Sequence, residues 1–475
     1  MILSFLTLKF TLFFLLFFYF YWLIPKGEKY KKVSLIIGSS TFYSFFSVPF
    51  LIHFYIILSL NYFLFKKFQE SKKYVTYVVL LNLFNLILFK YFYFISSLLG
   101  NMLGISALTE KPTLDLLISK AFGLPGFEIA LPATISYYSF QLISFAFDIR
   151  DHKIQTETDS ISYFVYCLFF PIMIAGPILR YNDFLTQFTN LNINREKMMD
   201  GIFLILLGVF KKMILSDGLT SIIYPVFGEP SGYSGLALLL TTYFFGLHLY
   251  LDFSGLTDLA RGLAMLLGFH LPINFKAPFF MRGFGDFWRR WHLTFSYWIR
   301  DYIYIPLGGS RGSDLKTSLN FVTTFTLGGL WHGANLNFAF WGMINGSYVA
   351  LERLLEIKKI NIIPDFKYKP IFYYLLVLHL DIITWILFFT KDLTTAFTVI
   401  VQILIMGKGI PLSYAETGFY TGLIVLIFHL FEEFPEKIKV NTMLRNSLIP
   451  LITIILYFLI ISRGGSNIDF YYTKF

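Results

Sequence analysis

Apolar runs of about twenty residues recur along this chain and alternate with short polar or basic turns. A run of that length crosses the ~30 Å hydrocarbon core of a bilayer when it folds as an α-helix. Continuous runs exclude a transmembrane β-barrel, whose strands alternate apolar and polar residues in segments of about ten. The pattern therefore predicts an all-α, polytopic transmembrane bundle of about eleven to thirteen helices.

The runs fall into three stretches. Residues 1–99 hold the N-terminal transmembrane helices, with one span predicted over 75–99, and residues 130–346 hold most of the polar segments. The remaining apolar runs, in 369–475, predict about four more helices, at 369–390, 394–407, 416–432 and 447–462. No internal repeat or soluble linker separates the stretches, so residues 1–475 are predicted to form a single membrane domain.

Two segments depart from the simple helical pattern. The apolar run 161–176 is broken by Pro171 and ends in Ala175-Gly176-Pro177. Proline and glycine at membrane depth are tolerated where other protein satisfies the backbone, so this run predicts a broken or re-entrant helix. The run 200–226 is interrupted by Lys211-Lys212, and a further apolar run follows at 234–252.

The composition is that of a membrane protein, and the charge distribution indicates which partners its loops face. Hydrophobic residues make up 56% of the chain and charged residues 14%, against about 25% charged in soluble domains. The net charge of +10 is concentrated in short loops, which favours cytoplasmic loops facing anionic lipid over a nucleic-acid partner. The lysine clusters within 26–32 and 66–73 are separated by two crossings, and the positive-inside rule places both in the cytoplasm.

The stretch from Phe284 to Gly346 gathers the candidate chemistry. It contains two histidines, several arginines, five of the seven tryptophans and repeated glycines. Ionisable groups near bilayer depth are costly and are a functional-site hypothesis by default. We therefore interpret this stretch as the reaction centre.

His332 is the first candidate, because it follows the uncharged run Phe321–Leu330. A neutral imidazole there can accept a proton as a general base, although a lone histidine on an apolar helix is more often a satisfied core residue. His292, in Arg289-Arg290-Trp291-His292, is the second candidate and is suited to bind or orient a donor.

Basic residues surround His292. The segment from Lys276 to Lys316 contains seven basic and three acidic residues. The basic residues are Lys276, Arg282, Arg289, Arg290, Arg300, Arg311 and Lys316, and the acidic ones are Asp286, Asp301 and Asp314. Arginine forks fit phosphates, so this segment predicts the cytoplasmic mouth of a site for a phosphate-bearing ligand or an acidic carrier protein. Ordinary loop charges under the positive-inside rule explain the same pattern equally well.

A pair of opposite charges precedes this segment. Asp258 and Arg261 have the i,i+3 spacing of neighbours on one helix face. A buried carboxylate requires such a partner, and a structural ion pair is the more common reading of this pattern than a functional one.

Familiar catalytic motifs are missing from the sequence. It contains no HExxH, paired CxxC, GxxxxGK[ST] or GxSxG. The sequence therefore predicts no bound metal or cofactor and gives no support to nucleotide hydrolysis or serine-hydrolase chemistry. The single cysteine, Cys167, lies inside an apolar run and is predicted to be a core residue.

Several motifs together resemble the membrane-bound O-acyltransferase (MBOAT) family, and within it the alginate O-acetyltransferase branch, which is related to the D-alanyl transfer proteins of teichoic acid modification. They are Asp286-Phe-Trp-Arg-Arg-Trp-His292-Leu-Thr-Phe-Ser296, Arg300-Asp-Tyr-Ile-Tyr304-Ile-Pro-Leu-Gly-Gly309, Leu330-Trp-His332-Gly-Ala334, Ser136-Tyr-Tyr-Ser-Phe-Gln141, Phe170-Pro-Ile-Met-Ile-Ala-Gly-Pro177-Ile-Leu-Arg180 and Asp252-Phe-Ser-Gly-Leu-Thr-Asp258. The resemblance covers the chain from about residue 130 to the end. Thr294 stands where that branch usually has serine.

The resemblance implies a reaction and roles for the residues. His332 is the family's essential histidine and His292 its second, with a catalytic core at 130–346 around a central tunnel. The acyl group, most simply acetyl, comes from a cytoplasmic thioester, which is acetyl-CoA or a carrier protein. Donor and substrate binding is assigned to eight residues: Arg289, Arg290, Trp291, Arg300, Asp301, Trp331, Asn335 and Asp258.

The resemblance also implies where the reaction happens. The protein is expected in the cytoplasmic (inner) membrane, and the acceptor is a hydroxyl of a cell-envelope polysaccharide. Transfer is either direct or passes through an extracytoplasmic partner of the SGNH acyltransferase type.

Two other functions fit parts of the pattern. A transporter or flippase of envelope glycan precursors would use the same arginines and broken helices, but the repeat symmetry common in transporters is absent from the sequence. A catalytically silent scaffold for an external acyltransferase is disfavoured by the intact His292 and His332.

Overall fold

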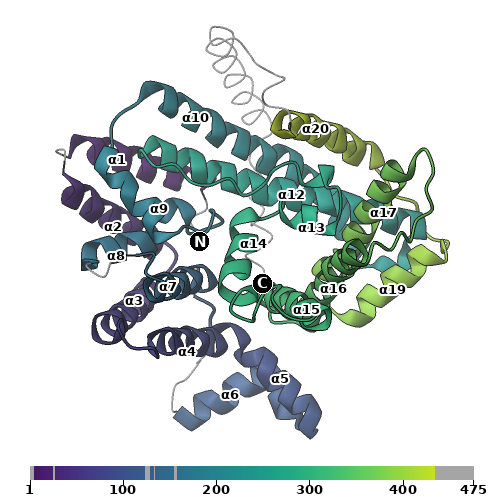
Figure 1. Ribbon diagram of the computed structural model, residues 1–475, viewed down its shortest axis with the longest axis horizontal. Coiled ribbons are helices and arrows are strands. Elements are labelled where there is room, and N and C mark those ends of the chain that lie inside the picture. The colour runs from purple at the N-terminus through teal and green to yellow at the C-terminus, as the bar shows by residue number, and fades with distance from the viewer. Residues whose placement is uncertain (1–4, 25–26, 123–128, 133, 155–157, 434–475) are drawn as a thin grey trace. The chain divides into compact units, whose positions relative to one another are not determined.

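The computed structural model describes residues 5–24, 27–122, 129–132, 134–154 and 158–433 (Figure 1). These residues fold into helices joined by turns, and no named strand occurs among them, so the predicted all-α fold is confirmed. The helix predicted at 447–462 lies outside the described residues.

The chain divides into two compact units. The first comprises residues 1–174 and 178–190, and the second comprises 175–177 and 191–475. That the two units act as the single membrane domain predicted for 1–475 stays a prediction, as does the central tunnel.

Within the described residues, four helices are long and apolar enough to cross a bilayer: Val48–Phe68, Tyr74–Leu103, Gly235–Leu266 and Lys369–Phe389. The predicted multi-pass character is therefore supported by length as well as by composition. The span predicted at 75–99 is longer than expected and is divided by a π-helical turn, Ile87–Tyr91. One apolar run can therefore contain two helices that a π-helical turn divides, and counting runs then counts them as one helix.

The helices of the first unit begin and end at recognisable caps. Ser47 accepts a hydrogen bond from the N–H of Phe50, and Asp159 accepts one from Ser162, as N-cap residues do. The helices are α1 (Leu8–Leu23), α2 (Glu28–Ser44), α3 (Val48–Phe68), α4 (Tyr74–Leu86), α5 (Phe92–Leu103), α6 (Lys111–Phe122), α7 (Ile135–Arg150), α8 (Ser160–Cys167) and α9 (Tyr181–Leu185).

The apolar run 161–176 is broken, as predicted, although α8 ends a few residues before Pro171. α8 ends at Cys167, and a single 3₁₀ turn, Phe170–Ile172, follows. The backbone N–H of Phe170 donates to the hydroxyl of Ser39 in α2, at 3.1 Å. A side chain of a neighbouring helix thus satisfies a backbone group freed by the break, as the membrane setting requires.

The second unit contains the remaining helices and carries all the predicted site residues. Figure 1 shows α10 and α12 running side by side, and α15 beside α16. The helices are α10 (Arg195–Val209), α11 (Asp217–Gly228), α12 (Gly235–Leu266), α13 (Phe284–Trp288), α14 (Leu293–Ile299), α15 (Asp314–His332), α16 (Leu336–Lys358), α17 (Lys369–Thr384), α18 (Ile386–Phe389), α19 (Leu393–Leu404) and α20 (Ala415–Glu433).

A π-helical turn, Phe210–Ser216, joins α10 to α11 and presents two lysines to α12. The ammonium of Lys212 lies 2.6 Å from Asp217 and 3.0 Å from Asp252, and that of Lys211 lies 2.7 Å from Asp258. Burial of these charges is possible because each finds an opposite charge. The two lysines, which the sequence showed only as an interruption, therefore pair α12 with the preceding helices.

Close backbone contact holds α15 against α16. A Cβ atom on Gly342 would lie 2.1 Å from the carbonyl oxygen of Phe325, and one on Gly329 would lie 2.1 Å from that of Phe338. Only glycine permits this approach. The resulting hairpin fixes the last turn of α15, where His332 lies.

Candidate active site

His332 is the final residue of α15 and is 5% exposed. Aromatic rings surround its imidazole: the ring centroids of Trp331, Phe388 and Trp341 lie 4.8, 5.1 and 5.3 Å away. Phe295 lies 5.7 Å away. The carbonyl end of a helix favours positive charge, so this position stabilises an imidazole that has accepted a proton.

His292 lies where the chain turns into α14. Its φ of 43° is in the left-handed region, which non-glycine residues seldom adopt outside functional or tightly constrained sites. The turn is held by paired backbone: the N–H of Lys276 donates to Arg290, and the N–H of Leu293 donates to Asn274, both at 2.9 Å. The preceding loop therefore fixes the direction of the His292 side chain.

Uncharged side chains enclose His292, which is 3% exposed. Its ring meets Phe253 of α12 at 4.6 Å, edge to face, and stacks on Phe295 at 5.0 Å. His292 lies outside the helices that are long enough to span a bilayer. Burial lowers its pKa to about 3, because the surroundings penalise the charged imidazolium. His292 is therefore neutral at physiological pH.

Phe295 connects the two histidines. Its ring contacts both imidazoles and also stacks on Trp331 at 4.6 Å. The structure thus brings His292, His332 and Trp331 into one cluster, built from the start of α14 and the end of α15. We call His292, Phe295, Trp331 and His332 the histidine cluster.

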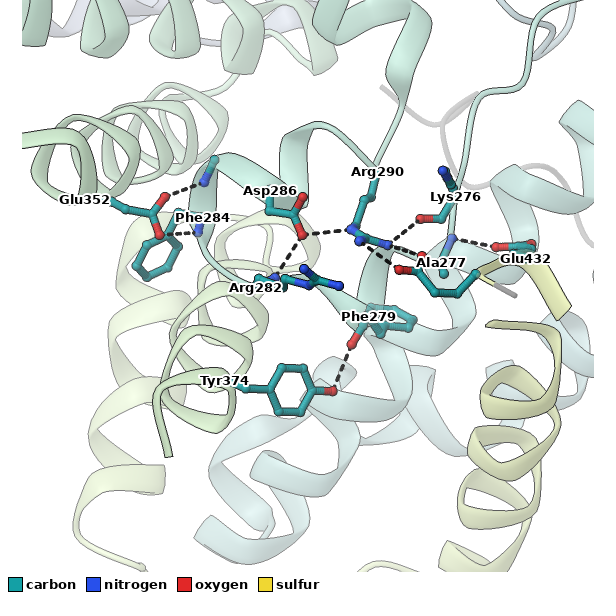
Figure 2. Close-up of polar contacts among 12 residues, drawn as sticks. Lys276, Ala277, Phe279, Arg282, Phe284, Asp286, Arg290, Glu352, Tyr374 and Glu432 are labelled. Carbon is teal, nitrogen blue, oxygen red and sulfur yellow. Dashed lines mark hydrogen bonds and ion pairs between the residues drawn. The ribbon is translucent and has the colours of Figure 1, made fainter. Parts of the chain in front are cut away.

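Arg290 does not point into that cluster. Its guanidinium donates to the carboxylate of Asp286 at 2.8 Å (Figure 2). It also donates to the carboxylate of Glu433 in α20 at 2.8 Å. The bond to Glu433 and the charge of Asp286 raise the pKa of Arg290. Both partners are intramolecular, so Arg290 ties the loop before His292 to the end of α20.

Further carboxylates hold the same loop in place (Figure 2). Glu432 accepts from the N–H of Ala277 at 2.6 Å. Glu352 of α16 accepts from the N–H groups of Phe284 and Gly285, at 3.0 and 2.7 Å. Carboxylates at a helix N-terminus satisfy its free donors, so α13 is anchored where it begins.

The other predicted binding residues lie in different settings. Trp291 is buried between Phe275 at 5.1 Å and Trp385 at 5.2 Å, in the aromatic core. Asn335 caps α16 and donates to the carbonyl of Lys391 at 2.9 Å. Asp258 pairs with Arg261 at 3.4 Å, as predicted, as well as with Lys211. Substrate binding by these residues stays a prediction.

Arg289, Arg300 and Asp301 offer more accessible charge. Arg289 is exposed, and the side chain of Arg300 is 54% exposed. Arg300 pairs with Asp301 at 2.7 Å and lies over the ring of Tyr297. Of the three arginines predicted to bind the donor, Arg289 and Arg300 are exposed and Arg290 is buried.

Sequence reasoning missed Asn274, Phe295 and the lysines of the π-helical turn. Asn274 interrupts the apolar run Leu271–Phe275, and that single polar residue was the available signal. Phe295 lies within the motif Asp286–Ser296, but nothing in that motif indicates that its ring contacts both histidines. Among the described residues, no three His, Cys, Asp or Glu side chains gather so that they could hold a metal ion.

Two buried histidines thus lie close together in a multi-pass helical protein, and comparison with known proteins identifies the class to which it belongs. The model of MBOAT, the membrane-bound O-acyltransferase family, matches residues 152–390. The probable alginate O-acetylase AlgI of Pseudomonas aeruginosa is 32% identical over 415 residues, which is 85% of this chain and 76% of that protein.

Two relatives with other names extend the comparison. The peptidoglycan O-acetyltransferase of Helicobacter pylori is 29% identical over 79% of this chain and 74% of its own length. The teichoic acid D-alanyltransferase of Bacillus subtilis is 26% identical over 52% of this chain and 65% of its own length. The chain belongs to the MBOAT family and is an acyltransferase.

The difference between the buried Arg290 and the exposed Arg300 leads to a prediction about stability. Arg290→Ala is expected to lower the free energy of unfolding by at least about 2–3 kcal/mol, since a single hydrogen bond to a charged group contributes about 1.5–3 kcal/mol. Arg300→Ala, the matched control, removes an exposed pair worth about 0–1 kcal/mol. Thermal unfolding of the detergent-solubilised variants measures both. Equal melting temperatures for the two variants would show that Arg290 holds nothing in place.

Proposed function

We propose that the protein transfers an acetyl group from a cytoplasmic thioester to hydroxyls of a cell-envelope polysaccharide. The histidine cluster carries the proposal, because it places two imidazoles together within the family's matched region. The names of the relatives support the acetyl group and the acceptor, since they include alginate and peptidoglycan O-acetylation.

His332 is the general base in this proposal. As a hydroxyl oxygen attacks the thioester carbonyl, the imidazole accepts its proton, the new C–O bond forms and the C–S bond breaks. The thiolate that leaves then takes up the proton. General-base catalysis of this kind contributes about 10²–10⁴-fold in rate. Aromatic rings surround His332, and an apolar setting of this kind would limit hydrolysis of the thioester.

The donor and the partner complete the proposal. Acetyl-CoA or an acyl-carrier protein is the co-substrate, and the exposed Arg289 and Arg300 attract its phosphates. The acceptor hydroxyl belongs to the polysaccharide or to a serine of an extracytoplasmic partner of the SGNH type. The protein resides in the inner membrane, which gives it access to a cytoplasmic donor and an external acceptor.

Mass spectrometry of envelope glycans tests this function. Cells carrying the gene are expected to show ester-linked acetyl groups that are absent after its deletion and return on complementation. Membrane vesicles supplied with ¹³C-acetyl-CoA identify the donor. D-alanyl esters in place of acetyl would redirect the proposal to the chemistry named for the teichoic acid relatives. Unchanged esters together with altered export of glycan would favour a transporter.

A further inference from the structure

Asn274 makes an unusual set of contacts with the start of α14. Its backbone carbonyl accepts from the N–H of Leu293 at 2.9 Å. Its side-chain oxygen accepts from the N–H of Thr294 at 3.2 Å and from the Thr294 hydroxyl at 2.9 Å. His292, the residue at the N-cap position, makes no capping bond with its own side chain. Asn274 therefore caps α14 from a separate segment.

The same oxygen of Asn274 lies 3.1 Å from Nδ1 of His292. The oxygen and nitrogen of an asparagine amide are distinguished by their hydrogen bonds, and here the assignment is forced. The backbone N–H of Thr294 can only donate, so the atom that faces it is the oxygen. That oxygen can only accept, so Nδ1 of His292 must carry a hydrogen.

A neutral imidazole carries one hydrogen, so this contact determines the chemistry of the opposite nitrogen. With Nδ1 protonated, Nε2 presents a lone pair. This Nε2 atom is buried and has no hydrogen-bond partner among the described residues. Leaving a buried acceptor unsatisfied costs about 1–3 kcal/mol, so the site is suited to a ligand that supplies a hydrogen.

We propose that Asn274 is a positioning residue that holds His292 as the Nδ1–H tautomer, so that Nε2 accepts a hydrogen bond from a substrate O–H or N–H. The proposal rests on the proposed function. The proposal gives the two histidines different roles. His292 accepts a hydrogen bond through Nε2 and does not donate one to the thioester carbonyl, whereas His332 is the general base. Two groups have this chemistry, namely the attacking hydroxyl and an amide N–H on the donor's thioester arm.

The surroundings of His292 favour this role and exclude a charge-based one. Its ring lies against Phe253 from α12, Phe295 from α14 and Trp331 from α15, with Asn274 on the remaining side. All four are uncharged. A carboxylate in place of Asn274 would therefore be the nearest charge to the ring and would stabilise the imidazolium.

Asn274→Asp tests the proposal with little change in shape. An aspartate still accepts from Thr294 and from Nδ1, so α14 remains capped and the tautomer is kept. The carboxylate raises the pKa of His292, so the acid limb of the pH–rate profile is expected to move to higher pH by about 1–3 units. If the neutral His292 ring that Asn274 holds took no part in the reaction, its protonation would leave the profile unchanged. That outcome would overturn the proposal.

Asn274→Leu and Thr294→Val complete the set. The leucine removes the acceptor and is expected to slow acetyl transfer at least about tenfold at every pH. Thr294→Val keeps the backbone N–H that orients Asn274, so its rate is expected to remain within about twofold. Rates are measured with ¹⁴C-acetyl-CoA and envelope polysaccharide from the deletion strain. A raised KM for acetyl-CoA in Asn274→Leu identifies the donor amide as the ligand, and a reduced kcat alone identifies the hydroxyl.

A spectroscopic measurement tests the role of Asn274 independently of the proposed acetyl transfer. Solid-state ¹⁵N spectra of histidine-labelled protein, minus those of His292→Gln, report the tautomer without any substrate. An unprotonated Nε2 is expected in the wild type, whether or not acetyl transfer occurs. A protonated Nε2 would refute the role of Asn274. Absence of acetyl transfer by the wild type, with the expected spectrum, would refute the proposed function alone.

Discussion

His332→Ala is expected to abolish acylation of the cell envelope, with a loss of about 10²–10⁴-fold in rate, while leaving expression and membrane insertion intact. The loss is expected because no other imidazole is held at the end of α15 to accept the proton of the attacking hydroxyl. The hairpin itself does not depend on that ring, since the contacts of Gly329 and Gly342 with the facing backbone hold it. Ester-linked acetyl on isolated glycans, measured per amount of membrane protein, provides the readout.

Two further variants separate chemistry from packing. His332→Gln fills most of the space between Trp331 and Trp341 but cannot act as a base at neutral pH, so it is expected to be as inactive as the alanine variant. His270→Ala alters an exposed histidine of the same unit and is expected to retain full activity. Near-normal acylation by either His332 variant would remove this residue from the catalytic role.

The helices could be predicted well from the sequence, because hydrophobic length is a local property. The run predicted at 369–390 is α17 with α18, and the run predicted at 416–432 lies within α20. The prediction erred where the helical geometry changes without a change in hydrophobicity. The π-helical turn at Ile87–Tyr91 contains one charged residue, Lys90, and a lone lysine does not distinguish a π-helical turn from a continuous helix.

The candidate site was predictable only in part, because it depends on which helices meet. Trp331 and His332 are adjacent in sequence, but their contact with Phe295 depends on how α15 packs against α14. A count of basic residues grouped Arg290 with Arg300. The structure separates them, since Glu433, 143 residues from Arg290, supplies the carboxylate that Arg290 needs. Tertiary pairing over such a distance leaves no local signal.

Buried ion pairs show the same limit most clearly. Lys212 and Asp252 are forty residues apart, yet they lie 3.0 Å apart because α10 and α12 approach closely. A Cβ on Gly208 would lie 2.4 Å from the carbonyl oxygen of Gly255, so glycine on both helices permits the approach. The sequence displays the lysine, the aspartate and the glycines, but only the register between the two helices joins them.

Lys212→Met is expected to destabilise the protein by about 3–5 kcal/mol, the usual effect of removing one partner from a buried ion pair. The Lys212 side chain is 2% exposed, and those of Asp217 and Asp252 are 2% and 0% exposed. Methionine keeps the length of the side chain but removes the ammonium, so two buried carboxylates face each other without it. The expected results are a lower melting temperature in detergent and a reduced yield of folded protein.

The same ion pair suggests a compensating substitution and a control for Lys212→Met. Adding Asp252→Asn removes one of the two carboxylates, so the double variant is expected to recover part of the lost stability, which a merely steric effect of methionine would not allow. Lys316→Met removes an exposed lysine of the same unit and is expected to change the melting temperature little. If Lys212→Met had the melting temperature of the wild type, the ammonium would not stabilise the junction of α10, α11 and α12. The close approach of the glycines of α10 and α12 would then be the contact that holds these helices together.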